Sequence, residues 1–284
     1  MNPLQRALIE KAGHDNGFEH VLPSDGPRVD LGSARHPTQV RVAVVADGLG
    51  VTIESGSATL AQELARTYPH AGHADQGFVL LTEAALAQWL RRAAALSQAL
   101  PNQAVMAFEA QLQTELAAMP AAAAQNTEVQ RMVRQRVGQQ AYRQAMLDYW
   151  GGACAVTGMA LSQALRASHA KPWAECASDA ERLDVFNGFL LSPNLDVLFD
   201  SFLISFAGSG ELLVSTAISV IDRQKLGLGA GMRLRWLSAQ HSPYWDFHRE
   251  RSFQLTTGED QPCAIGAGAQ RTPSSKFFGA GQSV

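Results

Sequence analysis

The chain has 284 residues, of which 46% are hydrophobic and 17% are charged, and its formal net charge is −3. That length suffices for one large domain or two ordinary ones, and the composition excludes a mainly disordered chain. Because the balance is slightly acidic, any site for nucleic acid has to be local. No apolar run approaches the roughly 20 residues of a membrane-spanning helix.

The first region, residues 1–116, mixes predicted strands and helices. The segment 38–55 alternates β-branched residues around Asp47-Gly48, which predicts a β-hairpin. Helices are predicted over 57–69, over 82–100 behind Thr82 as the N-cap, and over 103–119. Such an α+β module could read a DNA sequence, a modified base or a partner protein. Arg91 and Arg92 are compatible with DNA reading but are not diagnostic of it.

A stretch of Pro and Ala at 120–126 predicts a domain boundary, with residues 117–126 as the linker. A long helix then runs from Glu128 to the Gly151-Gly152 break. Its predicted apolar face consists of Val129, Met132, Val133, Val137, Ala141, Ala145 and Met146. A later hairpin turns at 208–210. We expect the second domain to span 127–253.

Residues 254–284 are rich in Gly, Ser, Gln and Ala, which predicts a disordered tail. The three cysteines are an odd number with no CxxC pair, namely Cys154, Cys176 and Cys263. This spacing disfavours a disulfide framework or zinc ribbon, and the N-terminus lacks the apolar stretch of a signal peptide. We therefore expect a cytoplasmic protein. The predicted mixture of helices and strands indicates fold class α+β.

Charge is unevenly distributed in the second domain. Basic residues prevail over 127–173 and acidic residues over 174–200. The basic residues that could hold phosphates are Arg131, Arg134, Arg136, Arg143 and Lys171. The acidic stretch could hold a divalent cation. From charge alone, chance clustering of solvated surface side chains is the favoured explanation.

Ser192 followed by Pro193 predicts a helix start, with serine as the N-cap and proline at the first helical position. A helix from there places Asp196 and Asp200 four residues apart on one face. Two carboxylates at this spacing repel each other, whereas a bound divalent cation would turn the repulsion into coordination.

Two segments, "ASHAKPW" (167–173) and "DVFNGFLLSPNLDVLFD" (184–200), follow one another in an order that resembles the HNH endonuclease family. The resemblance is to a branch with an HxKPW…NGLLLS…LFD pattern. A CxxTG turn at 154–158 and the segment 233–253 extend it, so it covers about 127–253. The family implies a ββα-metal core, in which two short antiparallel strands and a helix enclose a divalent ion.

The resemblance also implies a role for particular residues. His169 would be the general base, and Asn187 would orient it or shape the loop, although Asn187-Gly188 is also a common turn pair. Asp196 and Asp200 fall at metal-ligand positions. Ser168 stands where relatives often have Asp or His, and Asn194 is a nearby alternative that could simply reinforce the helix start. Such oxygen ligands favour Mg²⁺ or Mn²⁺ over Zn²⁺.

The sequence thus predicts a divalent-metal-dependent DNA endonuclease of restriction or DNA-defence type, whose N-terminal module chooses the target. The sequence does not decide whether the protein forms a homodimer. A DNA-binding protein with a degenerate, non-cleaving HNH core is the alternative, since Asp and Ser occupy ligand positions. An antibacterial effector nuclease is a third, weaker interpretation. Cys154, His241 and His248 are interpreted as structural.

Overall fold

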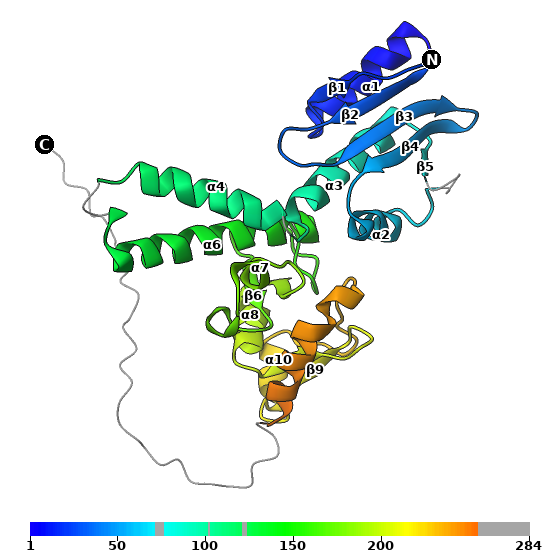
Figure 1. The fold of residues 1–284 in the computed structure, drawn as a ribbon. Coiled ribbons are helices and arrows are strands. Elements are labelled where there is room, and N and C mark those ends of the chain that lie inside the picture. Colours follow the sequence, from blue (N-terminus) through cyan, green and yellow to red (C-terminus); the bar gives the residue numbers. More distant parts are fainter. Residues whose placement is uncertain (72–76, 102, 121–123, 255–284) are drawn as a thin grey trace, which may run out of the picture.

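The protein is represented by a computed structural model that describes residues 1–71, 77–101, 103–120 and 124–254. The predicted tail lies outside the described residues from position 255 onward, as does Cys263. Figure 1 shows a sheet with its helices at the N-terminal end, a pair of long helices (α4 and α6), and a C-terminal lobe that packs below α6. The mixture of helices and separate antiparallel sheets confirms the α+β class.

The N-terminal region is built on a five-stranded antiparallel sheet in the order β1-β2-β3-β4-β5. Its strands are β1 (His20–Leu22), β2 (Arg28–Gly32), β3 (Gln39–Val45), β4 (Gly48–Ser55) and β5 (Phe78–Leu80). The predicted hairpin is confirmed, since Val45 pairs with Gly48 across the turn. Alternate residues such as Val40 and Val42 are buried, so one face of the sheet supplies the core.

Helices α1 (Pro3–Asp15), α2 (Ala58–Thr67) and α3 (Glu83–Ala99) accompany this sheet. The N-cap of α3 is the predicted Thr82, whose hydroxyl accepts a hydrogen bond from the Ala85 amide at 3.1 Å. Trp89 and Leu90 on α3 are fully buried. Helix α3 therefore packs both against the sheet and against α6 (Thr127–Trp150).

Helix α4 (Gln103–Ala117) and α6 (Thr127–Trp150) pack against each other, and α3 also contacts α6. The predicted linker lies between α4 and α6, and the domain boundary there stays a prediction. Helix α6 ends as expected at Gly151, which is left-handed with φ of 64°. Met132 was expected on the buried face but is 66% exposed, because the helical rotation carries it away from Val133.

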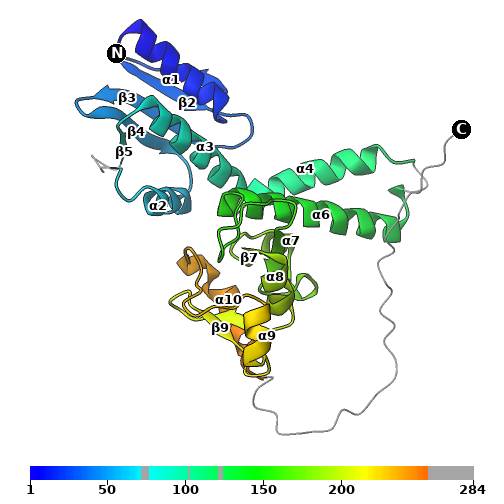
Figure 2. The same ribbon diagram turned by 180° about the vertical axis from the view of Figure 1, so that it is seen from behind.

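The C-terminal lobe contains two small antiparallel sheets together with short helices. Strands β6 (Arg166–His169) and β7 (Gly188–Leu191) pair antiparallel, and α8 (Pro193–Asp200) packs on β6. Strands β8 (Ile204–Phe206) and β9 (Leu212–Val214) form the second predicted hairpin. The remaining elements are α7 (Asp179–Arg182), α9 (Val220–Lys225), α10 (Ser242–Gln254) and 3-10 turns at Trp173–Glu175 and Ala239–His241. Figure 2 shows β7 and α8 below α6 from the other side.

Aromatic packing fixes the position of the β6–β7–α8 unit. Phe189 of β7 lies with its ring centre 5.6 Å from that of Phe199 on α8 and 5.0 Å from that of Phe206 on β8. All three rings are buried. No helix in the described part of the chain is long and apolar enough to cross a membrane.

Candidate active site

His169 lies at the end of β6, paired with Gly188 of β7. Its Nε2 is 2.9 Å from the backbone oxygen of Arg182. Because a carbonyl oxygen can only accept, Nε2 carries the proton and Nδ1 keeps a lone pair. Nδ1 forms no hydrogen bond with any described residue. Burial lowers the pKa of His169 to about 4, so the ring is neutral at neutral pH and presents Nδ1 as an acceptor.

Tyr142 of α6 stacks on the imidazole, with 3.8 Å between ring centres and 20° between planes. Burial raises the pKa of Tyr142 well above its usual value, so its hydroxyl stays protonated and donates to the Asn187 carbonyl at 2.9 Å. At Gly188 a Cβ would lie 1.9 Å from the Ser168 oxygen and 2.5 Å from the Tyr142 hydroxyl. Gly188 is therefore required by the close approach of the two strands, and Asn187 closes a turn just before it, with its amide donating to the Asp184 carbonyl at 2.9 Å.

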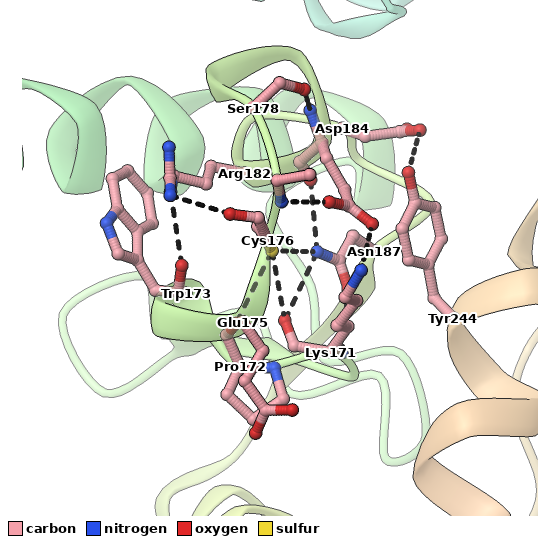
Figure 3. A network of polar contacts seen from close by, with 12 residues as sticks. Lys171, Pro172, Trp173, Glu175, Cys176, Ser178, Arg182, Asp184, Asn187 and Tyr244 are labelled. Atoms are coloured by element: carbon pink, nitrogen blue, oxygen red, sulfur yellow. Dashed lines mark hydrogen bonds and ion pairs between the residues drawn. The ribbon is translucent and has the colours of Figure 1, made fainter.

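The Asn187 side chain ties together the connection between β6 and β7, as Figure 3 shows. Its Oδ1 accepts from the Lys171 amide at 2.9 Å, and its Nδ2 donates to the carbonyls of Lys171 and Glu181 at 3.3 and 3.1 Å. Asn187 is fully buried. Since Glu181 precedes Arg182, this amide holds in place the very segment whose carbonyl orients His169. Of its two predicted roles, the geometry favours shaping the loop.

Helix α8 begins at Pro193 as predicted and presents two carboxylates toward β6. The Ser168 hydroxyl donates to Asp196 Oδ1 at 2.5 Å. Desolvation, and then the negative charge of Asp196, raise the pKa of Asp200 to about 6. Both carboxylates lie on one face of α8, as the four-residue spacing predicts, and neither has an ion-pair partner among the described residues.

A pocket of about 330 Å³ opens beside these groups. His169 and Asp200 both line it, so the imidazole and one carboxylate face the same space. Trp173, Phe202 and His248 supply aromatic walls. The neutral imidazole of His169 and the carboxylate of Asp200, which has no ion-pair partner among the described residues, therefore line one small, partly desolvated pocket.

The comparison with protein families agrees with this geometry. Residues 154–207 match the model of the HNH endonuclease family. The matched segment contains β6, β7 and α8 together with every residue of the base and carboxylate set. Residues 154–207 are an HNH domain. No curated protein shows significant similarity to the chain. The family indicates nuclease activity on nucleic acid, and the HxKPW branch stays a prediction.

HNH nucleases generally use a divalent metal ion, so the ligands available in this HNH domain matter. Among the described residues, no group of three or more His, Cys, Asp and Glu side chains is arranged to hold a metal ion. The oxygen donors near the site are the carboxylates of Asp196 and Asp200 and the hydroxyl of Ser168. Mg²⁺ often binds proteins through one or two carboxylates and keeps several waters, so this set fits a hard cation.

Asn194 is engaged away from the carboxylates of the HNH domain. Its Oδ1 accepts from the Ser192 hydroxyl at 2.7 Å, and its Nδ2 donates to the Leu226 carbonyl at 2.8 Å. Ser192 therefore occupies the N-cap position of α8 without capping it through its side chain, which differs from the prediction. The geometry favours a structural role for Asn194, fastening the start of α8 to the end of α9.

The basic residues proposed to hold phosphates are mostly paired within the chain. Arg134 pairs with Asp179, Arg136 with Glu115, and Lys171 with Glu181 at 2.6 Å. Arg143 donates to the carbonyls of Ser162 and Leu165, both at 2.6 Å. Arg131 is exposed and has no side-chain partner in the ranges that the structure describes. Phosphate binding by the paired cations would have to compete with these contacts, whereas Arg131 is available as it stands.

The aromatic side chains around His169 were not predicted from the sequence. Tyr142 lies outside the family match, on a helix whose polar sequence gives no sign of a site. His248 is buried and bonded to the Phe199 carbonyl at 2.9 Å, as a structural histidine would be, but it also lines the pocket. His241 and Cys154 are fully buried, which agrees with their structural interpretation. These contacts arise from segments far apart in the chain, so no local pattern could reveal them.

Proposed function

We propose that this protein is a divalent-metal-dependent endonuclease that hydrolyses DNA phosphodiester bonds, with its N-terminal region choosing the target. The observation that carries the proposal is the orientation of His169. Its Nε2–H is donated to the Arg182 carbonyl, and its Nδ1 lone pair is left for chemistry in a pocket shared with Asp200. A metal-assisted nuclease uses this combination of an oriented base and nearby carboxylates that can hold a cation.

His169 would take a proton from the attacking water at Nδ1. Because the pKa of His169 is lowered to about 4, the ring is in its basic form throughout the neutral range. The Arg182 carbonyl accepts from the opposite nitrogen and stabilises the imidazolium that forms. Tyr142 holds the ring plane, and Asn187 holds the loop that carries Arg182.

Asp196 and Asp200 would hold the cation, with Ser168 orienting Asp196 through its hydrogen bond. The raised pKa of Asp200 supports this role, because a carboxylate that is destabilised by desolvation and by a neighbouring carboxylate gains most from a cation. Mg²⁺ or Mn²⁺ suits an all-oxygen set. When bound, such a cation polarises the scissile phosphate and stabilises the leaving oxygen.

The N-terminal sheet region would select the target, and the protein would act in restriction or DNA defence in the cytoplasm. The two described cysteines, Cys154 and Cys176, are free and buried, which is compatible with a reducing compartment. The exposed Arg131 would contribute a phosphate contact, and a homodimer would bring two HNH domains to one duplex.

A cleavage panel tests the proposal. Purified protein is incubated with Mg²⁺, Mn²⁺, Ni²⁺ or Zn²⁺ and with unmodified, methylated or hydroxymethylated plasmid. We expect nicking with Mg²⁺ or Mn²⁺ that chelation abolishes and that His169→Ala removes while the fold survives. Salt-sensitive DNA binding without calorimetric Mn²⁺ binding or cleavage would instead support the degenerate, non-cleaving alternative.

A further inference from the structure

Phe202 adopts an unusual backbone conformation immediately after α8. Among the described residues it is the one non-glycine residue with a positive φ, at 56°. Its amide donates to the Phe199 carbonyl, and the Leu203 amide donates to the Leu198 carbonyl, both at 2.9 Å. This bonding ends a helix with a left-handed residue, a position where glycine is strongly preferred because a Cβ is strained there. An aromatic residue in a glycine position calls for a reason.

The ring of Phe202 lines the same pocket as His169 and Asp200. Packing of the core does not explain the choice, because His248, the ring that Phe202 contacts at 4.8 Å, is already stacked on Phe199 at 3.7 Å with 3° between planes. His248 is also fixed by a hydrogen bond to the Phe199 carbonyl. We therefore attribute the strained backbone of Phe202 to the placement of its ring in the pocket. Residues with strained backbones cluster at functional sites.

Beside the His169 and Asp200 groups, the pocket has aromatic faces on which a nucleobase can stack. Trp173 also lines it, with its ring 5.7 Å from the His169 ring and edge-on to it. A neutral nucleobase can stack on such aromatic faces, while the cation proposed at Asp200 would hold the neighbouring phosphate. A volume of about 330 Å³ is at the lower end of the range for small-ligand pockets, which suits a single group.

We propose that Phe202, together with Trp173, stacks an unpaired nucleobase of the substrate next to the scissile phosphate. The substrate class is therefore nucleic acid with an unstacked nucleotide at the cut, either single-stranded or locally opened. This inference rests on the proposed nuclease function. It adds a substrate-binding residue, Phe202, to the HNH domain and makes duplex opening part of recognition.

Binding of single-stranded DNA oligonucleotides tests the proposal without cleavage. Each oligonucleotide carries one 2-aminopurine, whose fluorescence falls when it stacks on an aromatic ring, and EDTA is present throughout. The variants are Phe202→Leu, which keeps the strained backbone without an aromatic ring, Phe202→Gly, which also relieves the strain, and Phe202→Tyr, which keeps the aromatic face. Val220→Ala, at a 72% exposed position that does not line the pocket, is the matched control.

We expect at least about fivefold weaker binding and loss of the fluorescence quench for the Leu and Gly variants, since one base–aromatic stack is lost. Phe202→Tyr should keep both signals, and Val220→Ala should bind as the wild type does. The midpoint of thermal unfolding for Phe202→Gly should stay within about 4 °C of wild type, because relief of strain offsets the lost ring contacts.

Wild-type binding by Phe202→Leu, or a Phe202→Gly variant that loses stability in step with binding, would overturn the proposal and leave the ring as packing. Absence of oligonucleotide binding by the wild type would overturn it as well. Failure of the nuclease function is separable. A protein that never cleaves but shows the Phe202-dependent quench keeps the base-stacking site and loses only hydrolysis.

Discussion

Two histidines with lowered pKa values, one in the N-terminal sheet region and one in the HNH domain, share a hydrogen-bond arrangement but differ in access. His36 places Nε2 3.1 Å from the Gly17 carbonyl, and His169 places Nε2 2.9 Å from the Arg182 carbonyl. Burial lowers the pKa of both. His36 is only 3% exposed and its Nδ1 is enclosed without a partner, whereas His169 lines a pocket with Asp200.

The acidic residues of the two regions differ in a related way. In the sheet, Arg41 lies 2.9 Å from both Asp30 and Glu54, so each carboxylate has a positive partner. In the HNH domain, Asp200 has Asp196 as its neighbour, and the pKa of Asp200 rises to about 6. Burial and a carbonyl hydrogen bond therefore do not distinguish the proposed base from a structural histidine. His169 combines a place in the pocket of Asp200 with an Nδ1 that has no hydrogen bond among the described residues, whereas Nδ1 of His248 in the same pocket lies 3.2 Å from the Ser205 hydroxyl.

Alanine substitution at the two histidines should separate their roles most strongly. We expect His169→Ala to lower the cleavage rate by about 10²- to 10⁴-fold, because the general base is lost, with circular dichroism unchanged. His36→Ala should lower the free energy of unfolding by roughly 1–3 kcal/mol and leave the cleavage rate per folded molecule near wild type. Equal cleavage losses in the two variants would contradict the distinction.

Two glycines with positive φ give the next largest contrast. Gly188→Ala should destabilise the protein by at least about 3 kcal/mol, because its Cβ would overlap the Ser168 oxygen. Gly26→Ala, in the sheet region, has φ of 79° but no atom within 4 Å of the added Cβ, so a cost of about 1 kcal/mol is expected. Chemical denaturation measures both. A mild effect at Gly188 would mean that β6 and β7 can separate without loss of the fold.

Acid should destabilise the C-terminal lobe through its buried histidines. The pKa values of His169, His241 and His248 are each lowered to about 4 by burial. Because the folded pKa is below the unfolded value of ~6.5, their contribution is fully present above that pH and is lost as pH falls toward 4. At pH 5 each histidine should lower the free energy of unfolding by about 2 kcal/mol relative to pH 7. Urea unfolding at the two pH values checks this, and His169→Asn should reduce the difference.

The smallest effect is expected at Asp200, and it has the opposite sign. The folded pKa of Asp200, about 6, is above the usual value, so ionisation of this carboxylate lowers the free energy of unfolding of the metal-free protein. The loss is absent below pH ~4 and develops as pH rises through 6. Asp200→Asn should therefore stabilise the metal-free protein at pH 8 by on the order of 1 kcal/mol, after solvent screening is allowed for. Added Mn²⁺ should stabilise the wild type more than the variant. Destabilisation by Asp200→Asn without metal would argue against an unneutralised pair.

Some features could be predicted from local sequence because their causes are local. Alternating β-branched residues around Asp47-Gly48 predict the hairpin, and Ser192-Pro193 predicts the start of α8. Helical periodicity then fixes Asp196 and Asp200 on one face. The pattern of motifs around His169 and Asn187 indicated the HNH domain, since the spacing of these residues follows from the ββα unit itself.

Other features depend on segments that meet only in the folded chain. The stack of Tyr142 on His169 joins α6 to β6, and the pairing of Arg134 with Asp179 removes a cation that charge counting treats as free. The aromatic wall around Asp200 comes from the β6–β7 connection, the end of α8 and α10. The sequence by itself determined which groups are proposed to carry the chemistry and their order along the chain. Tertiary structure alone decided which of them are desolvated, paired or accessible, because burial and charge pairing depend on neighbours in space.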